Sequence, residues 1–173
     1  MTGLISSHFI KNREQLQRTL GTTLRGATVD VGAFDLFRRG LLRHIAEEER
    51  VLFPALTRAL GAPPLNREAL RHHHAGLATW CAPQPERESI ENLQALFIEH
   101  AALEEAPGGL YEVADQVLGA QAASVLAQAR ALPPIKLTPF NCGPWVRQLL
   151  TEVLRASGVA ASPERTVFRA ASE

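Results

Sequence analysis

The sequence has few cysteines, and this argues against any structure held together by sulfur. Only Cys81 and Cys142 occur among 173 residues, far apart and in no CxxC pair, so neither a disulfide framework nor a thiolate metal site is indicated. We expect Cys81, which falls on a helical face, to act as a small buried apolar residue. Cys142 lies in a turn-rich segment, where a structural thiol is favoured over a reactive one.

The chain also lacks an excess of either charge and any long apolar run. Lys+Arg and Asp+Glu both number 18, and without a basic patch we expect no nucleic-acid partner. No apolar run approaches the length of a membrane span. Residues 1–8 lack the basic start and apolar block of a secretory signal. We therefore expect a cytoplasmic protein with no membrane partner.

Apolar periodicity and helix-ending residues predict an all-α chain with one substantial core. The expected helices span about residues 3–24, 31–60, 67–81 and 88–106, followed by shorter ones at 110–118, 120–132 and 145–156. Asp30 and Asn66 are the expected N-caps, and Gly61 is the expected C-terminal stop. Pro54 predicts a bend or an irregular turn between residues 49 and 53. Residues 133–144 read as an irregular connector and those from Ser157 as a frayed end.

The four long helices, joined by short loops, predict an antiparallel up-down-up-down four-helix bundle with additional C-terminal helices. We place the bundle at residues 1–118. Residues 119–173 then form a C-terminal helical extension.

His44 and Glu48 lie four residues apart on an otherwise apolar stripe of the second helix. The stripe, in steps of three and four, is Phe34, Phe37, Leu41, His44, Glu48, Leu52 and Ala55. This spacing points both polar side chains at the core. A carboxylate removed from water costs several kcal/mol unless it is paired or bound to a cation. The rest of the chain should therefore supply a partner.

A second copy of the motif supplies it, because His100 and Glu104 continue a stripe that begins with Leu93 and Phe97. At about 1.5 Å per residue, His8, His74 and both motifs reach a common depth. The third helix can bury either His74 or its neighbour His73, and the spacing from Leu70 favours His74. The candidate ligands are His8, His44, Glu48, His74, His100 and Glu104.

Nitrogen and oxygen ligands without thiolate suit iron or manganese, with zinc as a competitor. A carboxylate four residues after each motif histidine can reach a second metal. The pattern therefore predicts a two-metal centre bridged by Glu48 and Glu104, with positions left open for water, hydroxide or dioxygen.

The combination of His8, His44-Ile-Ala-Glu-Glu48-Glu-Arg-Val-Leu-Phe-Pro54, His74-Ala-Gly-Leu77 and His100-Ala-Ala-Leu-Glu104-Glu105 resembles the hemerythrin-like HHE cation-binding family. The resemblance covers about residues 1–118. It implies a four-helix bundle with a cofactor of two non-haem iron ions, with an oxo or hydroxo bridge as an option and manganese or zinc as substitutes. It also implies that the six candidate residues are the ligands.

This sequence departs from the oxygen-carrying hemerythrins, which have a further histidine four residues after the third-helix ligand and an aspartate in the last motif. Here the residue four positions after His73 is Leu77, and the residue four positions after His74 is Ala78. The last motif ends in Glu104. The missing histidine argues against simple oxygen carriage and leaves a more open iron. The resemblance therefore implies a protein that binds or responds to dioxygen or a related small oxidant, in sensing, iron handling or detoxification.

Two other roles follow from the same residues. One is a metal-stabilised regulatory module whose C-terminal helices dock a protein partner or a second copy of the chain. The other is an enzyme, which we rank below a metal-binding or sensor protein.

Side chains next to the motifs carry weaker expectations. Glu47, Glu49 and Glu105 read as solvated more often than as supports behind the ligands. Tyr111, the single tyrosine, reads as a packing anchor rather than a redox participant.

Overall fold

The computed structural model of the chain describes residues 3–141, 143, 145–146, 148–149 and 152, and within them every regular element is helical. The expectation of an all-α chain is therefore confirmed for this part. The predicted helix over residues 145–156 lies mostly outside the described residues. Cys142 and the predicted frayed end lie wholly outside them. No helix in the described ranges combines the length and the apolar character needed to cross a membrane.

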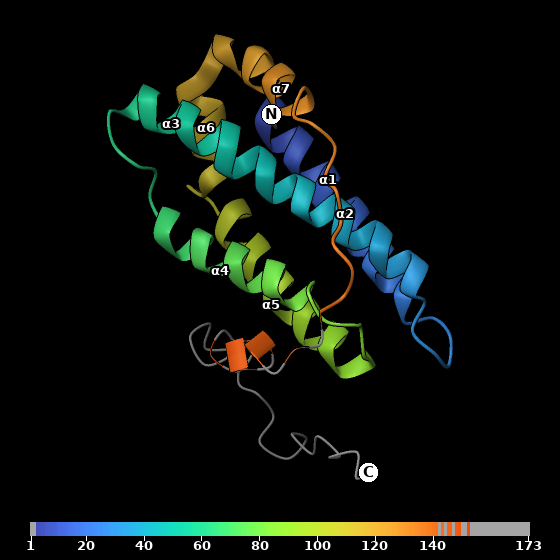
Figure 1. The fold of residues 1–173 in the computed structure, drawn as a ribbon. Helices are drawn as coiled ribbons and strands as arrows, with labels where there is room; N and C mark the ends of the chain where they lie inside the picture. Colours follow the sequence, from blue (N-terminus) through green and yellow to red (C-terminus); the bar gives the residue numbers. More distant parts are fainter. Residues whose placement is uncertain (1–2, 142, 144, 147, 150–151, 153–173) are drawn as a thin grey trace.

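Four long helical segments lie side by side (Figure 1). They are α1 (Leu4–Thr23), α2 (Val31–Glu47) with its continuation into η1 (Glu48–Leu52) and α3 (Phe53–Leu60), α4 (Arg67–Trp80), and α5 (Arg87–Glu105). Helix α1 packs along α2, and α4 packs along α5. These bounds agree within one residue with those expected from the sequence.

The helix ends follow the expected chemistry with one exception. The Asp30 side chain accepts a hydrogen bond from the Ala33 amide at 2.9 Å, which caps α2. Gly61 ends α3 in the left-handed conformation at φ 71°. Asn66 precedes α4, but its side chain makes no capping hydrogen bond and its own backbone is left-handed at φ 62°. The predicted side-chain cap at Asn66 is therefore wrong.

The irregular turn predicted near Pro54 is the π-helix η1 (Glu48–Leu52). Pro54 has no amide hydrogen, so the α-helical hydrogen-bond pattern cannot pass through it unchanged. The amide of Phe53 instead donates to the Glu48 carbonyl, five residues back. Single π-turns of this kind are rare and are frequent at functional sites.

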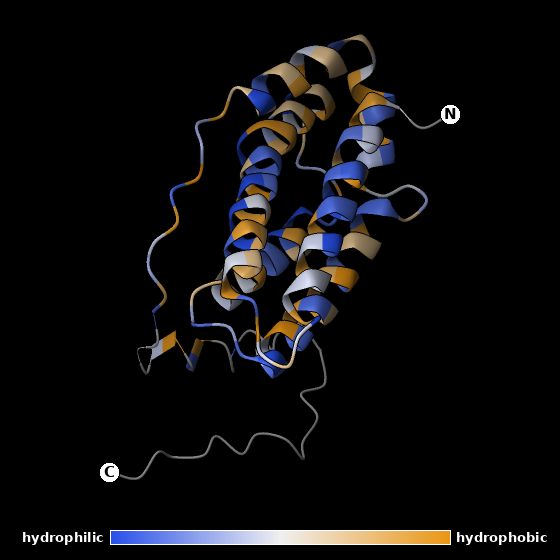
Figure 2. Cartoon of the chain, turned by 90° about the vertical axis from the view of Figure 1, so that its right-hand side faces the viewer, coloured by the Kyte–Doolittle hydropathy of each residue, from blue (hydrophilic) through white to orange (hydrophobic). Residues whose placement is uncertain are grey.

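Two shorter helices, α6 (Leu110–Leu118) and α7 (Ala122–Arg130), follow a turn at Pro107-Gly108-Gly109 and are joined by the 3₁₀ turn η2 (Gly119–Gln121). Helix α6 packs against α1, α3 and α5, and α7 contacts α1 and η1. Residues 133–141 then run without regular structure along the outside of α2, toward the far end of the long helices (Figures 1 and 2). Arg39 and Arg38 of α2 hold this segment through the carbonyls of Ile135 and Thr138.

The core has two apolar clusters with a polar layer between them. One cluster joins the start of α1 to η1, α3, α6 and α7, and includes Phe9, Leu52, Leu56, Leu70 and Leu126. The other occupies the opposite end of the long helices and includes Leu20, Phe37, Leu41, Leu77, Cys81 and Phe97. Cys81 is buried, as expected. Along α2, α4 and α5, the predicted metal-ligating residues fall between these two sets.

Candidate metal site

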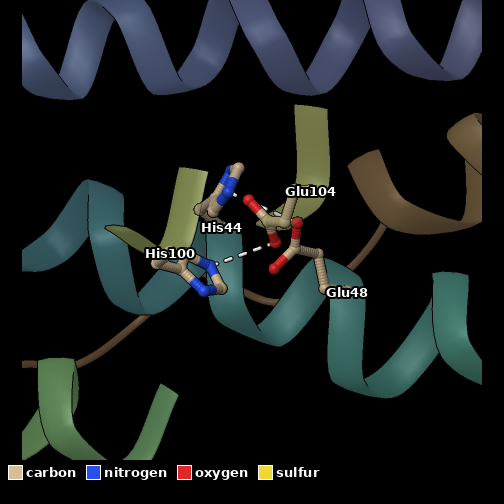
Figure 3. Close-up of side chains that lie close together, drawn as sticks. All are labelled: His44, Glu48, His100 and Glu104. Atoms are coloured by element: carbon tan, nitrogen blue, oxygen red, sulfur yellow. Dashed lines mark ion pairs between the residues drawn. The ribbon is translucent and has the colours of Figure 1, made fainter. Parts of the chain in front are cut away.

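Four of the six predicted ligands converge at the centre of the molecule. His44, Glu48, His100 and Glu104 each offer a ligand atom, and these atoms lie within 4.8 Å of one another (Figure 3). Helix α2 supplies His44, η1 supplies Glu48, and α5 supplies the other two. All four side chains are fully buried. This buried His/Glu cluster has the composition of a site that could hold a metal ion.

His74 of α4 joins the cluster from the side of Glu48. Its Nε2 atom lies 3.0 Å from Oε2 of Glu48, and its ring centroid is 4.8 Å from that of His100. His73 is only half-buried, and its ring lies 5.9 Å from that of His100. His72 is exposed and contacts the Glu68 carbonyl of its own helix. Of the three consecutive histidines, His74 is therefore the one that faces the carboxylates.

The Tyr111 hydroxyl from α6 lies within the same cluster, and sequence reasoning missed this role. It donates to Oε1 of Glu48 at 2.5 Å and to Oε2 of Glu104 at 2.8 Å, and lies 3.4 Å from Nε2 of His44. The Tyr111 ring also stacks on Phe9, with centroids 5.2 Å apart. Tyr111 is therefore a packing residue, as expected, whose hydroxyl is aimed at the predicted bridging carboxylates.

The two oxygen atoms of each carboxylate face two different groups of side chains. Oε1 of Glu48 faces His44 and Tyr111, whereas Oε2 of Glu48 faces His74. Oε2 of Glu104 faces Tyr111, whereas Oε1 of Glu104 lies 3.0 Å from Nε2 of His100. We call the first group the His44 half and the second the His74 half. Each half contains one oxygen of Glu48 and one oxygen of Glu104.

Several inward-facing atoms of the cluster have no hydrogen-bond partner among the described residues. They are Oε2 of Glu48, Nε2 of His74, Oε1 of Glu104 and Nε2 of His100. Buried polar atoms in proteins are normally satisfied, so four such atoms facing one another require an explanation. A bound cation would satisfy all four at once, because each offers a lone pair to it.

Glu49 holds His74 from outside the cluster. Oε1 of Glu49 lies 2.8 Å from Nδ1 of His74, and a carboxylate oxygen only accepts, so Nδ1–H is the donor. This leaves Nε2 to face Glu48 and fixes the ring orientation. Carboxylate support of this kind is usual behind metal-binding histidines. Arg71 in turn pairs with the other oxygen of Glu49 at 3.4 Å.

His8, the sixth predicted ligand, points to a different carboxylate. Its Nε2 atom lies 3.1 Å from Oε2 of Glu47 and therefore carries a proton toward it. Arg43 donates to the other oxygen of Glu47 at 2.7 Å. It also donates to the carbonyls of Ala129 in α7 and of Leu132 just after this helix. The ring of Phe9 lies near both the His8 ring and the His44 ring. His8 thus belongs to a network that joins α1, α2 and α7 beside the cluster.

Of the three neighbouring glutamates, Glu47 is buried, contrary to the favoured expectation, whereas Glu49 and Glu105 remain partly exposed. Glu47 is buried with His8 and Arg43. Glu49 and Glu105 side chains are each 24% exposed, and Glu105 forms an ion pair with Arg13 of α1. The motif spacing placed all three off the apolar stripe. Side chains of neighbouring helices, which periodicity does not report, cover Glu47 and partly cover Glu49 and Glu105.

Burial dominates the electrostatics of the cluster. It lowers the pKa of His44 despite the nearby Glu48, and it lowers the pKa of His100 to about 4. Both imidazoles are therefore neutral near pH 7, which is the form that binds metals. Burial also lowers the pKa of His74, but the neighbouring carboxylates of Glu48 and Glu49 outweigh this and the net shift is upward. Burial raises the pKa of Glu104 to about 7.

Comparison with protein-family models, with curated proteins and with solved structures found no match to this chain. The resemblance to hemerythrin-like proteins therefore rests on the motif residues themselves.

Proposed function

We propose that this chain is a hemerythrin-like protein that holds two non-haem iron ions and binds or responds to dioxygen or a related small oxidant. The observation that carries the proposal is the buried cluster, in which two carboxylates each divide their oxygens between two groups of donors. An arrangement of this kind suits two metal ions joined by two bridging carboxylates.

The burial of so many polar groups favours a bound cation over a metal-free cluster. Two carboxylates and three imidazoles are removed from water between two apolar clusters. Burying such groups costs several kcal/mol each unless they are paired and hydrogen-bonded. Yet four of their inward-facing atoms have no hydrogen-bond partner among the described residues. A function that needs these groups together accounts for a cluster that stability alone would disfavour.

His44, Glu48, His74, His100 and Glu104 would hold the metal ions, with Glu48 and Glu104 as the bridges. Imidazole and carboxylate without thiolate favour iron or manganese and also accept zinc. When iron is bound, it supplies reversible one-electron chemistry toward small oxidants. The protein positions the ligands: Glu49 orients His74, and the apolar clusters on both sides exclude bulk water from the centre.

The arrangement of the helices supports the same proposal at a coarser level. Four long helical segments lie side by side and direct side chains from α2, η1, α4 and α5 to one layer. We infer an antiparallel four-helix bundle of the hemerythrin-like type. In such bundles, metal sites are built from inward-facing side chains on facing helices.

The first experiment measures metal content and oxidant reactivity together. The chain is purified after growth with iron, and its metals are measured by mass spectrometry. We expect about two iron ions per chain. Anaerobic ferrous protein is then mixed with dioxygen, and we expect a visible absorption change with consumption of dioxygen. Zinc as the sole metal, one iron per chain, or iron that does not react would each contradict the corresponding part of the proposal.

Glu48→Ala tests the assignment of the bridges. Because the two oxygens of Glu48 face different halves of the cluster, this variant should lose iron from both positions rather than from one. Glu105→Ala is the matched control, since Glu105 contacts Arg13 and no residue of the cluster. Its iron content should equal that of the wild type.

A further inference from the structure

The two halves of the cluster contain unequal sets of histidines. The His74 half has two imidazoles, from His74 and His100, together with one oxygen from each carboxylate. The His44 half has one imidazole and the same two kinds of carboxylate oxygen. The sequence predicted His8 as a further ligand, but Nε2 of His8 is engaged by Glu47. The position beside His44 is taken by the hydroxyl of Tyr111.

Tyr111 reaches this position through a sharp turn rather than along a bundle helix. Helix α5 ends just after Glu104, and Gly108 adopts φ 73° to reverse the chain. Gly109 then approaches the Glu104 backbone so closely that a Cβ atom there would lie 2.6 Å from the Glu104 carbonyl oxygen. The turn therefore returns α6 over the end of α5 and aims Tyr111 at the carboxylate seven residues before it.

The single hydroxyl group of Tyr111 is shared as a hydrogen-bond donor between two carboxylates. A phenol has a single O–H, yet its oxygen lies 2.5 Å from Glu48 and 2.8 Å from Glu104, in surroundings that are fully buried. The two acceptors converge on a point that a cation bound by both carboxylates would also approach. The phenol oxygen is thus held beside the predicted metal position by the same atoms that would bind the metal.

We propose that the Tyr111 oxygen is itself a metal ligand and completes the His44 half in place of His8. The inference rests on the metal centre proposed above and adds a ligand to it. When the metal binds, the O–H bond of Tyr111 breaks, its electron pair stays on the oxygen and is donated to the metal, and the proton leaves to solvent. No oxidation or reduction accompanies this exchange.

Tyr111 is the only tyrosine in the chain, which makes the test direct. Ferric protein should show a visible tyrosinate-to-iron charge-transfer band, and resonance Raman excitation within that band should enhance tyrosinate ring modes. Any such signal must come from Tyr111. The wild-type spectrum therefore tests the ligand without depending on the folding of a variant.

Tyr111→Phe keeps the aromatic ring on Phe9 and removes only the hydroxyl. We expect it to lose the charge-transfer band, to release about one proton fewer per two-metal centre filled, and to bind iron about 10- to 100-fold more weakly. Circular dichroism should show the wild-type helix content. His8→Gln is the contrasting variant. It should keep both the band and the iron affinity, because His8 faces Glu47 rather than the cluster.

The outcomes separate this inference from the function on which it rests. Iron-loaded wild-type protein without tyrosinate modes would overturn the assignment of Tyr111 while leaving the metal centre intact. Loss of iron in His8→Gln with retention in Tyr111→Phe would restore His8 as the ligand. Failure of the wild type to bind any transition metal would overturn both proposals.

Discussion

Glu49 acts on the cluster without belonging to it, because it binds the Nδ1–H of His74 while Nε2 faces Glu48. Removing such a support usually lowers metal affinity by about 10- to 100-fold without removing a ligand. We therefore expect Glu49→Ala to bind iron more weakly by that factor while retaining full occupancy at high iron concentration. Competition with a chelator of known affinity measures the change.

Glu105→Ala is the control for this variant, because the two carboxylates are equally exposed and each has an arginine partner. Only Glu49 touches a histidine of the cluster. Equal losses of affinity in the two variants would show that general surface charge, rather than the orientation of His74, was responsible.

Glu104 carries a second residue-scale prediction, which concerns the metal-free protein. Burial raises its pKa from 4.5 to about 7. Between these pH values the native state binds a proton that the unfolded state does not. The free energy of unfolding is therefore highest below pH 4.5, as far as Glu104 affects it, and falls as the pH rises to 7. Glu104→Gln removes the titrating group. We expect the metal-free variant to be more stable than the wild type by about 1–3 kcal/mol at about pH 8, and by much less at about pH 4.

Urea unfolding of chelator-treated proteins at both pH values measures this difference. His100, whose pKa is lowered to about 4, gives the opposite slope between pH 4 and 6.5, but it is present in both proteins and largely cancels in the comparison. The same variant should bind metal poorly. A variant destabilised equally at both pH values would show that Glu104 serves only as a packing group.

Individual residues differ in how far their place in the site could be predicted from the sequence. His44, Glu48, His100 and Glu104 interrupt apolar stripes, so their burial followed from the helical period alone. Tyr111 was missed because it follows a turn, beyond the last motif. A signal existed, since Tyr111, Ala114 and Leu118 form a short stripe of their own, and a buried tyrosine hydroxyl usually needs a partner. The identity of that partner depended on the direction of the turn.

At the scale of elements, the helix bounds were predictable because periodicity and the punctuating Gly, Pro and Asp residues agreed with one another. The turn type at Pro54 was not. A missing amide can be accommodated by a kink, a break or a π-turn, and the choice depends on tertiary contacts. Here the π-turn keeps the chain helical while Glu48 faces the core and Glu49 faces α4. One irregular turn thus supplies both Glu48, a proposed ligand, and Glu49, which holds His74.

The turn between α5 and α6 carries the element-scale prediction. A Cβ atom at Gly109 would lie 2.6 Å from the Glu104 carbonyl oxygen and 2.7 Å from that of Ala106, both of them backbone atoms. Gly109→Ala must therefore push α6 away from α5. We expect a loss of about 1–3 kcal/mol in unfolding free energy, which is typical of overpacking. Urea denaturation measures it.

Gly21→Ala is the matched control within α1, because a Cβ atom there would meet nothing within 4 Å. It should be neutral or stabilising by up to about 1 kcal/mol, since alanine is the better helix former. The displacement of α6 should also weaken the tyrosinate band of the iron-loaded Gly109→Ala protein. Equal stability of the two variants would argue against close packing at this turn.

The whole molecule places its buried polar layer between two apolar clusters, so the layer is connected to both ends of the fold. A metal bound there would join α2, η1, α4 and α5. We therefore expect these elements to unfold together. A ligand that binds only the native state adds about 4 kcal/mol to the free energy of unfolding when its free concentration is about 1,000 times its dissociation constant. For a chain of this length, that amount corresponds to a rise in melting temperature of roughly 8–16 °C.

Scanning calorimetry of iron-loaded and chelator-treated protein should therefore show a single transition that moves upward by about this amount with metal. Glu48→Ala should lose the shift, because both halves of the cluster need its oxygens, whereas Glu105→Ala should retain it. A metal-dependent shift that survives in Glu48→Ala would place the bound metal elsewhere on the chain. A melting temperature that metal does not change would mean that metal does not bind to the native state at this cluster. The buried carboxylates would then need another explanation.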